Sequence, residues 1–315
     1  MNSGLILVGE PMGLLIAQSE GSLDHVKGYD LAVAGAEFNV AIGTARLNHK
    51  VTYMTKLGDD PFGKLIVNVL NENNIGNEFV TFSKERPTGF MLKGRTSKGD
   101  PDIFYFRKNS AASTLCTDDV EKIDLSQYSN IHLTGILPAL SKSAKEATFT
   151  LMQKAKEQGL FISFDPNLRP QLWQSEKDMI ETINKLASYA DLVLPGENEG
   201  KILVGSKDAK TINEFYLNNG ASICVTKCGS KGAYVSTNKG ENYMVNGYTV
   251  KKVVDTVGAG DGFATGVITA LMENLPLDKA VKRSTAIGAI QVMSRGDNEG
   301  LPTREELTNF QFLSN

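Results

Sequence analysis

Short apolar runs alternate with longer amphipathic segments along most of the chain. The runs are rich in Val, Ile, Leu and Phe, and they cover residues 5–8, 51–55, 131–134, 160–164, 192–194, 223–226 and 233–236. Apolar strands of this kind are typical of sheets that are covered on both faces. Segments with helical composition lie between them, over residues 62–71, 142–157, 259–273 and 277–293. Because strands that alternate with helices form parallel sheets, the pattern predicts an α/β fold with helices on both faces of the sheet.

Two regions interrupt this alternation, at residues 11–34 and 88–108. Both contain strand-like runs with no helix between them, and the second holds a cluster of turn residues, Gly94, Gly99, Asp100 and Pro101. We expect these regions to form a small antiparallel sheet outside the main one, acting as a lid on a single domain that spans residues 1–315. A simple hairpin extension of the core is the alternative.

Composition narrows the possible functions and the cellular location. The 33 basic and 36 acidic residues leave a net charge of −3, so no basic surface for nucleic acid is expected. No apolar run reaches the roughly 18 residues that span a bilayer, and the first run is broken by Glu10 and Pro11. The three cysteines, Cys116, Cys224 and Cys228, are too few and too scattered for a disulfide framework or a four-ligand zinc site. We therefore expect a cytoplasmic protein with no membrane contact.

The glycine-rich segment at residues 255–266 is the strongest candidate for chemistry. Its small residues Gly258, Ala259 and Gly260 run directly into an apolar helix. Backbone N–H groups at such a helix start are unpaired and favour anions, so the turn could hold a phosphoryl group. Asp261 would stand at the mouth of this anion hole and accept a proton from an attacking hydroxyl. The alternative is an ordinary helix start in which Asp261 only complements the helix dipole.

The same segment resembles the C-terminal signature of the ribokinase (PfkB) family of sugar kinases. A second stretch matches the N-terminal signature of that family, at residues 34–41, 45–47 and 57–60. The resemblance covers nearly the whole chain. It implies a ribokinase-like three-layer αβα sandwich with a mainly parallel central sheet and a small β-sheet lid, often found at a dimer interface. It therefore predicts an ATP-dependent carbohydrate kinase that forms a homo-oligomer.

The resemblance also implies a role for individual residues. Asp261 would be the catalytic base, with the amides of Gly258, Ala259 and Gly260 as the anion hole. The sugar would contact Gly35, Ala36, Glu37 and Asn39. The nucleotide would contact Asn167, Lys227, Gly229, Gly232, Gly258, Gly260 and Ser294. Mg²⁺ would bridge the ATP phosphates near Glu199, and a monovalent cation such as K⁺ would lie near Asp255; the family often has Asn where this chain has Gly196, which leaves the magnesium position open.

Four further segments resemble 2-keto-3-deoxygluconate kinases, a branch of this family, at residues 105–108, 133–136, 165–169 and 294–300. In that branch the positions of Arg107 and Arg169 bind the carboxylate of the sugar acid, and those of Tyr105 and Asp297 complete the sugar site. The planar fork of a guanidinium suits a carboxylate and stays charged when a lid closes. Ordinary ion pairs are the alternative for both arginines. The branch has a tyrosine after Thr-Gly where this chain has Phe90-Met91, so one hydroxyl contact is expected to be lost.

Three hypotheses follow from the sequence. The first is a kinase that phosphorylates 2-keto-3-deoxygluconate at its terminal hydroxyl, giving the 6-phosphate. The second is another kinase of the family, such as a fructokinase or a 5-dehydro-2-deoxygluconate kinase. The third is a non-catalytic sugar-binding protein that keeps the fold, against which the intact Gly-Ala-Gly-Asp261 motif argues.

Overall fold

The main sheet has nine strands in the part of the chain that the computed structural model describes, residues 4–96 and 101–313. In the spatial order β13-β12-β11-β10-β9-β8-β1-β4-β5, the strands from β11 to β5 are all parallel, and β12 and β13 extend the edge as antiparallel strands. Their bounds are β1 (Gly4–Val8), β4 (Val51–Gly58), β5 (Gly76–Ser83), β8 (Tyr128–Thr134), β9 (Phe161–Asp165), β10 (Leu192–Val193), β11 (Ile223–Lys227), β12 (Gly232–Thr237) and β13 (Asn242–Asn246). The predicted mainly parallel sheet is confirmed.

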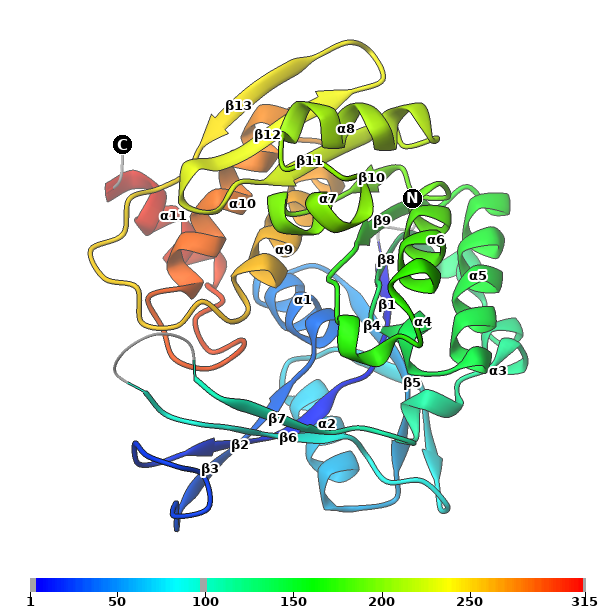
Figure 1. Cartoon of the computed structure of the whole chain (residues 1–315), viewed down its shortest axis with the longest axis vertical. Helices are drawn as coiled ribbons and strands as arrows, with labels where there is room; N and C mark the ends of the chain where they lie inside the picture. Colours follow the sequence, from blue (N-terminus) through cyan, green and yellow to red (C-terminus); the bar gives the residue numbers. More distant parts are fainter. Residues whose placement is uncertain (1–3, 97–100, 314–315) are drawn as a thin grey trace.

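Helices cover both faces of this sheet (Figure 1). One face carries α1 (Ala36–Arg46), α2 (Pro61–Glu72), α9 (Ala259–Met272), α10 (Leu277–Gln291) and α11 (Arg304–Leu313). The other face carries α3 (Thr117–Glu121), α4 (Leu137–Leu140), α5 (Lys142–Glu157), α6 (Glu176–Ala187), α7 (Glu197–Leu203) and α8 (Ala209–Asn218). Alternate residues of β1 serve the two cores: Leu5 and Leu7 pack toward α1 and α9, whereas Ile6 and Val8 pack toward α5. The three-layer αβα arrangement follows from this burial on both faces.

A second, four-stranded sheet lies apart from the main one, at the lower edge of the view in Figure 1. We call it the lid sheet; its strands are β2 (Met12–Ala17), β3 (Tyr29–Ala34), β6 (Phe90–Lys93) and β7 (Ile103–Phe106), in the order β3-β2-β6-β7. The expectation of a fully antiparallel sheet is wrong for its central pair, because β2 and β6 are parallel. The chain enters β2 and β6 from the carboxyl ends of β1 and β5, which run in the same direction in the main sheet. Of the expected turn residues, Gly99 and Asp100 lie outside the described part of the chain.

Local sequence signals explain how the lid is attached. Asp60 caps α2 by accepting a hydrogen bond from the Gly63 amide at 2.8 Å, and Pro61 occupies the first helical position. The other oxygen of Asp60 accepts from the Thr88 amide at 2.7 Å, and the Thr88 hydroxyl accepts from the Gly58 amide. One capping residue thereby fixes both the start of a core helix and the entry to lid strand β6.

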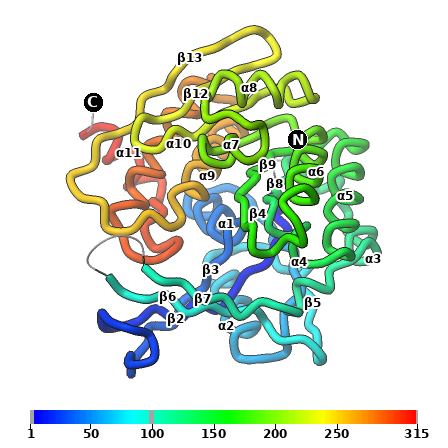
Figure 2. Tube along the Cα trace, viewed as in Figure 1, coloured from blue at the N-terminus to red at the C-terminus, as the bar shows by residue number. Residues whose placement is uncertain are grey.

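The two sheets meet at short connections. Residues 9–11 join β1 to β2, and Gly35 alone joins β3 to α1. Gly35 has φ 141°, and a Cβ there would lie 2.9 Å from the carbonyl oxygen of Glu10, so glycine is required at this position. The tube in Figure 2 shows the lid strands passing beneath the helices α1 and α9. Among the described residues no helix has the length and apolar character needed to cross a membrane.

Candidate active site

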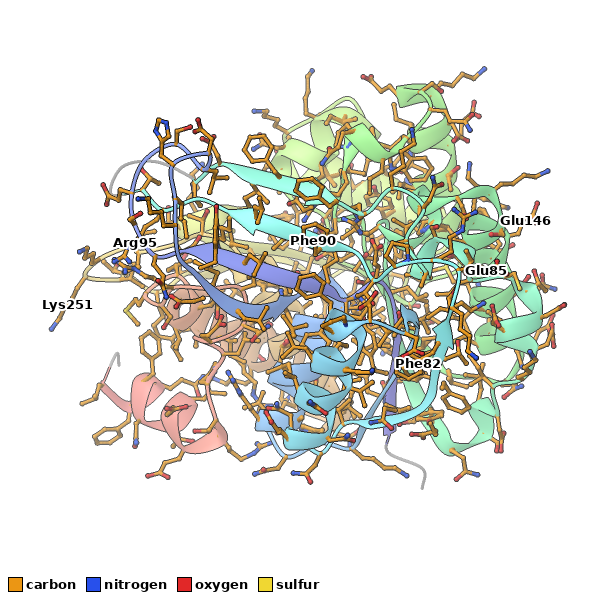
Figure 3. All side chains as sticks on the ribbon, turned by 90° about the horizontal axis from the view of Figure 1, so that it is seen from below. Phe82, Glu85, Phe90, Arg95, Glu146 and Lys251 are labelled. Carbon is orange, nitrogen blue, oxygen red and sulfur yellow. The ribbon has the colours of Figure 1, made fainter. Side chains whose placement is uncertain are left out.

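A cavity of about 410 Å³ lies between the lid sheet and the carboxyl ends of the main-sheet strands. The lid contributes Met12, Met91, Ile103 and Tyr105 to its wall. The core contributes most of the residues that the sequence predicts for the site, namely Gly35, Ala36, Asn39, Arg107, Asn167, Arg169, Glu199, Lys227, Gly258, Gly260, Asp261 and Asp297. Figure 3 views the molecule from the lid side and shows Phe90 on a lid strand. Phe90 stacks on Phe62 of α2 and on Phe106, so it braces the lid on the face away from the cavity.

The turn before α9 has the geometry of an anion hole. Gly258 is the N-cap of the helix, with φ 79°, and a Cβ on it would overlap the carbonyl oxygen of Asp297. Ala259, Gly260 and Asp261 form the first turn, where backbone N–H groups have no partner inside the helix. Both Gly258 and Gly260 line the cavity. The Ala259 amide also donates to the carbonyl of Thr256 at 3.4 Å. The helix dipole and the amides of this turn favour an anion at this point.

Asp261 is held at the mouth of this turn by two amide side chains. Its Oδ2 accepts from Nδ2 of Asn39 at 2.7 Å, and its Oδ1 accepts from Nδ2 of Asn167 at 3.5 Å. Burial raises the pKa of Asp261 to about 7, partly offset by the hydrogen bond from Asn39 and the charges of Arg169 and Lys227. A carboxylate whose pKa lies near neutrality is well matched to accept a proton from a hydroxyl group.

One positioning residue escaped sequence analysis. Asn298 donates from Nδ2 to Oδ1 of Asn39 at 3.0 Å and to the carbonyl of Val33 at 2.9 Å. Because Oδ1 of Asn39 is an acceptor in this bond, its Nδ2 is fixed as the donor that faces Asp261. Asn298 lies in the 294–300 segment that resembles the sugar-acid kinases, but a single amide in a loop carries no local signal of this role.

Arg107 is buried and paired with a carboxylate of the protein. Its Nε donates to Oε2 of Glu10 at 2.6 Å, and Nη2 forms an ion pair with the same oxygen. The other oxygen of Glu10 accepts from the Ser110 hydroxyl. Arg107 therefore forms the ion pair that was the alternative to a carboxylate-binding role. The edge of its guanidinium that carries Nε and Nη2 is occupied by Glu10.

Arg169 has a different environment at the same cavity. Its Nη1 donates to the backbone carbonyls of Leu168 at 2.9 Å and Asn167 at 3.3 Å. No carboxylate among residues 4–96 and 101–313 lies within ion-pair distance of it. Arg169 therefore carries a positive charge at the cavity that backbone carbonyls orient but do not neutralise.

Lys227 at the end of β11 reaches the carboxyl end of β9. Its Nζ lies 2.6 Å from Oδ2 of Asp165, a residue for which sequence analysis assigned no role. Burial lowers the pKa of Lys227, but Asp165 and Glu199 outweigh this effect and raise it. Glu199 caps α7 through the Gly196 amide and also accepts from the Leu168 amide. Where the family often has Asn, this chain has Gly196, and the backbone amide of Gly196 donates to the carboxylate of Glu199.

A second cavity of about 380 Å³ adjoins the first and shares Lys227, Thr256 and Gly260 with it. It is lined by the turn residues Gly229 and Gly232, by Ala259, and by the apolar side chains of Tyr248, Val250, Val253, Phe263, Ala289 and Val292. An apolar slot that opens onto an anion-binding helix start suits a nucleotide, with its base in the slot and its phosphates toward α9.

Three predicted site residues, Glu37, Ser294 and Asp255, do not line either of these two cavities. Glu37 is fully buried beneath the cavity, where Oε1 accepts from the Thr134 hydroxyl, and burial raises its pKa to about 7. Ser294 lines neither of the two cavities and packs against Gly300. Asp255 accepts from the Val257 amide at 3.0 Å and forms an ion pair with Lys93 of the lid at 2.7 Å.

Comparison with known proteins identifies the family of this chain. The family model for pfkB carbohydrate kinases matches residues 3–304. The chain belongs to this family. Among curated proteins, this pfkB kinase is 43% identical to 2-dehydro-3-deoxygluconokinase of Bacillus subtilis (strain 168), over 98% of the chain and 96% of that protein. It is 29% identical to a fructokinase of Vibrio alginolyticus, over 96% of the chain and 97% of that protein.

Solved structures share the fold over nearly the whole length. A PfkB protein from Polaromonas sp. JS666 has 40% identity and a TM-score of 0.88, with 96% of this chain and 98% of that chain covered. A fructokinase double mutant from Vibrio cholerae O395, solved with fructose, ADP and potassium ion, has 25% identity and a TM-score of 0.87, with 98% of both chains covered. Recognition of the family from the two sequence signatures is thereby confirmed, and with it the assignment as an ATP-dependent carbohydrate kinase.

Proposed function

We propose that this kinase phosphorylates 2-keto-3-deoxygluconate, also called 2-dehydro-3-deoxygluconate, at its terminal hydroxyl. The observation that carries the proposal is Arg169, a cation without a carboxylate partner among the described residues, in the same cavity as the base Asp261. A neutral sugar would leave this charge without a counter-ion, whereas the carboxylate of a sugar acid would supply one. The similarity to the Bacillus subtilis enzyme supports the same substrate.

In the proposed reaction Asp261 accepts the proton of the terminal hydroxyl as its oxygen attacks the γ-phosphorus. The oxygen–phosphorus bond to ADP breaks, and the amides of Gly258, Ala259 and Gly260 bind the phosphoryl oxygens during transfer. Asn39 holds Asp261 in place and stabilises its ionised form. In the same cavity Arg169, Arg107, Tyr105 and Asp297 would hold the acid, so that the reacting hydroxyl faces the base.

The nucleotide would fill the apolar slot, with Lys227 near its phosphates. A Mg²⁺ ion would neutralise phosphate charge when bound. Glu199 fits as the residue that holds it, because each of its two oxygens accepts only one N–H and keeps capacity for a ligand. No group of three or more metal-binding side chains occurs in the described part of the chain, which suits an ion held chiefly by phosphates and water.

Two further expectations belong to the proposal. The outer face of the lid sheet exposes Leu31, Phe104 and Phe106 to solvent, and these apolar side chains would be covered in a homo-oligomer built through the lid. We also expect the enzyme to act in the cytoplasm.

The test compares kcat/KM for 2-keto-3-deoxygluconate with that for fructose, by coupled detection of ADP. Arg169→Ala should raise KM for the acid by about 10–150-fold, the worth of one hydrogen bond between charged groups, and should change KM for fructose much less. Arg86→Ala, at an exposed loop arginine outside the cavity, is the matched control. An unmodified enzyme that prefers fructose would overturn the proposed substrate.

Arg107 needs a different design, because Arg107→Ala alone would leave Glu10 charged and buried. A double variant, Arg107→Met with Glu10→Gln, removes both charges together. If Arg107 helps to bind the carboxylate, this variant should also lose preference for the acid. If the ratio of kcat/KM for the acid to that for fructose stays unchanged, Arg107 has a structural role and Arg169 alone selects the substrate.

The Glu10–Arg107 pair favours a second candidate, a fructokinase. Because Glu10 already balances Arg107, only one unbalanced cation remains to demand an acidic substrate. The similarity of this chain to fructokinases, at 29% and 31% identity, also supports this second candidate. The same ratio of kcat/KM values decides between the two, and 5-dehydro-2-deoxygluconate belongs in the same panel of sugars.

A further inference from the structure

Lys93 is a buried cation that the reaction described above does not use. It ends lid strand β6, its side chain is 3% exposed, and its Nζ lies 2.7 Å from Oδ2 of Asp255 and 3.0 Å from Oδ1 of Asp297. Both acids are nearly as buried as the lysine. Removing water from three charged groups is costly unless they satisfy one another, so the contact is unlike an adventitious surface ion pair.

The two acids flank the anion hole. Asp255 starts the glycine-rich turn, and its Oδ1 accepts from the Val257 amide at 3.0 Å, which shapes the backbone just before Gly258. The carbonyl oxygen of Asp297 packs so closely against Gly258 that no side chain would fit there. One ammonium group therefore connects both backbone segments that define the position of the anion hole.

This arrangement does not fit a monovalent cation on Asp255. The sequence predicts such an ion near Asp255, and the related fructokinase from Vibrio cholerae O395 was solved with potassium ion. In this chain one oxygen of Asp255 holds the Lys93 ammonium and the other holds a backbone amide. An ammonium has the same unit charge as K⁺ and offers three N–H donors, two of which Asp255 and Asp297 accept.

We infer that Lys93 takes the place of a monovalent cation beside the anion hole, so that catalysis by this kinase does not depend on K⁺. The lysine is a positioning residue: it fixes the turn at residues 255–258 and supplies a positive charge close to the site of phosphoryl transfer. Because Lys93 belongs to the lid sheet, this charge is delivered by the lid, on the same face as the cavity residues Met91 and Tyr105.

A third cavity makes the inference testable by replacement. It has a volume of about 400 Å³ and is lined by Lys93, Asp255, Gly296 and Glu299 among others. A small cation could reach Asp255 through this space once the lysine side chain is shortened or made neutral. The variant Lys93→Met keeps most of the apolar stem and removes the ammonium group, with its charge and its N–H donors.

The experiment measures kcat/KM of the full-length enzyme in KCl, NaCl and choline chloride at equal ionic strength, with whichever sugar the unmodified enzyme phosphorylates. The unmodified enzyme should show the same rate in all three salts. Lys93→Met should lose about 10–150-fold in choline chloride, as expected for a lost hydrogen bond between charged groups, and should recover in KCl. Lys93→Arg should remain active and indifferent to the salt.

A melting experiment gives a readout without substrate. KCl should raise the melting temperature of Lys93→Met relative to choline chloride, and should leave that of the unmodified enzyme unchanged. Lys56→Met is the matched control, because Lys56 forms a half-buried ion pair with Asp119 at 2.8 Å away from the cavity. This control should lose stability without gaining any response to K⁺.

Two results would overturn the inference. Activation of the unmodified enzyme by K⁺ would show that an ion is still required, and this result needs no variant. Folded Lys93→Met that is equally slow in all three salts would show that the ammonium is not standing in for an ion. Neither result depends on which sugar is the substrate, so failure of the substrate proposal would be seen separately in the kcat/KM ratio.

Discussion

The pH dependence of kcat/KM should report the ionisation of Asp261. Only the ionised carboxylate can accept a proton, and burial raises its pKa from 3.8 to about 7. A group with a pKa of about 7 is about 9% ionised at pH 6, half at pH 7 and about 91% at pH 8, so kcat/KM should rise about tenfold between pH 6 and pH 8. The rate is thus lost as the pH falls through neutrality, not through the usual range of an aspartate near pH 4.

Asn39→Ala sharpens this test, because the Asn39 hydrogen bond lowers the pKa of Asp261. Without it the inflection should move to higher pH, so that the variant is most impaired near pH 7 and recovers partly near pH 9. Asn184→Ala is the matched control: Asn184 also makes two side-chain hydrogen bonds, to Leu203 and Tyr216, but lies outside the cavity. The assay is coupled ADP release at low sugar concentration. A flat profile from pH 5.5 to 8.5, or the same inflection in both Asn variants, would refute the assignment of Asp261 as the titrating base.

The remaining predictions concern the base, the lid and the assembly. Asp261→Asn should bind ATP in a calorimetric titration yet lose about 10²–10⁴ in kcat, the usual worth of a positioned base; near-normal turnover would contradict the mechanism. Backbone amides of β6 and β7 should exchange hydrogen more slowly when saturating sugar is added, because a closing lid excludes water; unchanged exchange would argue against closure. Phe104→Lys on the outer face of the lid should convert an oligomer into a monomer in light scattering, and no change in mass would place the interface elsewhere.

The fold could be predicted because its signals are local and repeated. Strands buried on both faces read as continuous apolar runs, and the predicted helix at residues 142–157 matches α5 in both of its bounds. The central lid pair was mispredicted because pairing between β2 and β6 depends on how two distant hairpins approach each other. No local pattern distinguishes a parallel from an antiparallel neighbour in such short strands.

A candidate site residue carries a sequence signal where backbone geometry dictates its type, as at Gly35 and Gly258, which both have positive φ. The signal is lost where the role depends on a partner far along the chain. Glu10 neutralises Arg107, and Lys93 binds Asp255 and Asp297, across separations of 97, 162 and 204 residues. Such pairs are fixed only by the tertiary fold, so the identity of the charged residues alone could not reveal them.

The lid sheet also has a consequence for the order of folding. The chain passes between the two sheets four times, and Gly13 of β2 pairs with Phe90 of β6. This pair closes a loop that includes α1, β4, α2 and β5, and such long-range pairs are expected to form late in folding. During synthesis the hairpin of β2 and β3 cannot pair with β6 until residue 93 has emerged. We expect the lid to be the last part of the enzyme to fold, and mild destabilisation to remove sugar binding before the core unfolds.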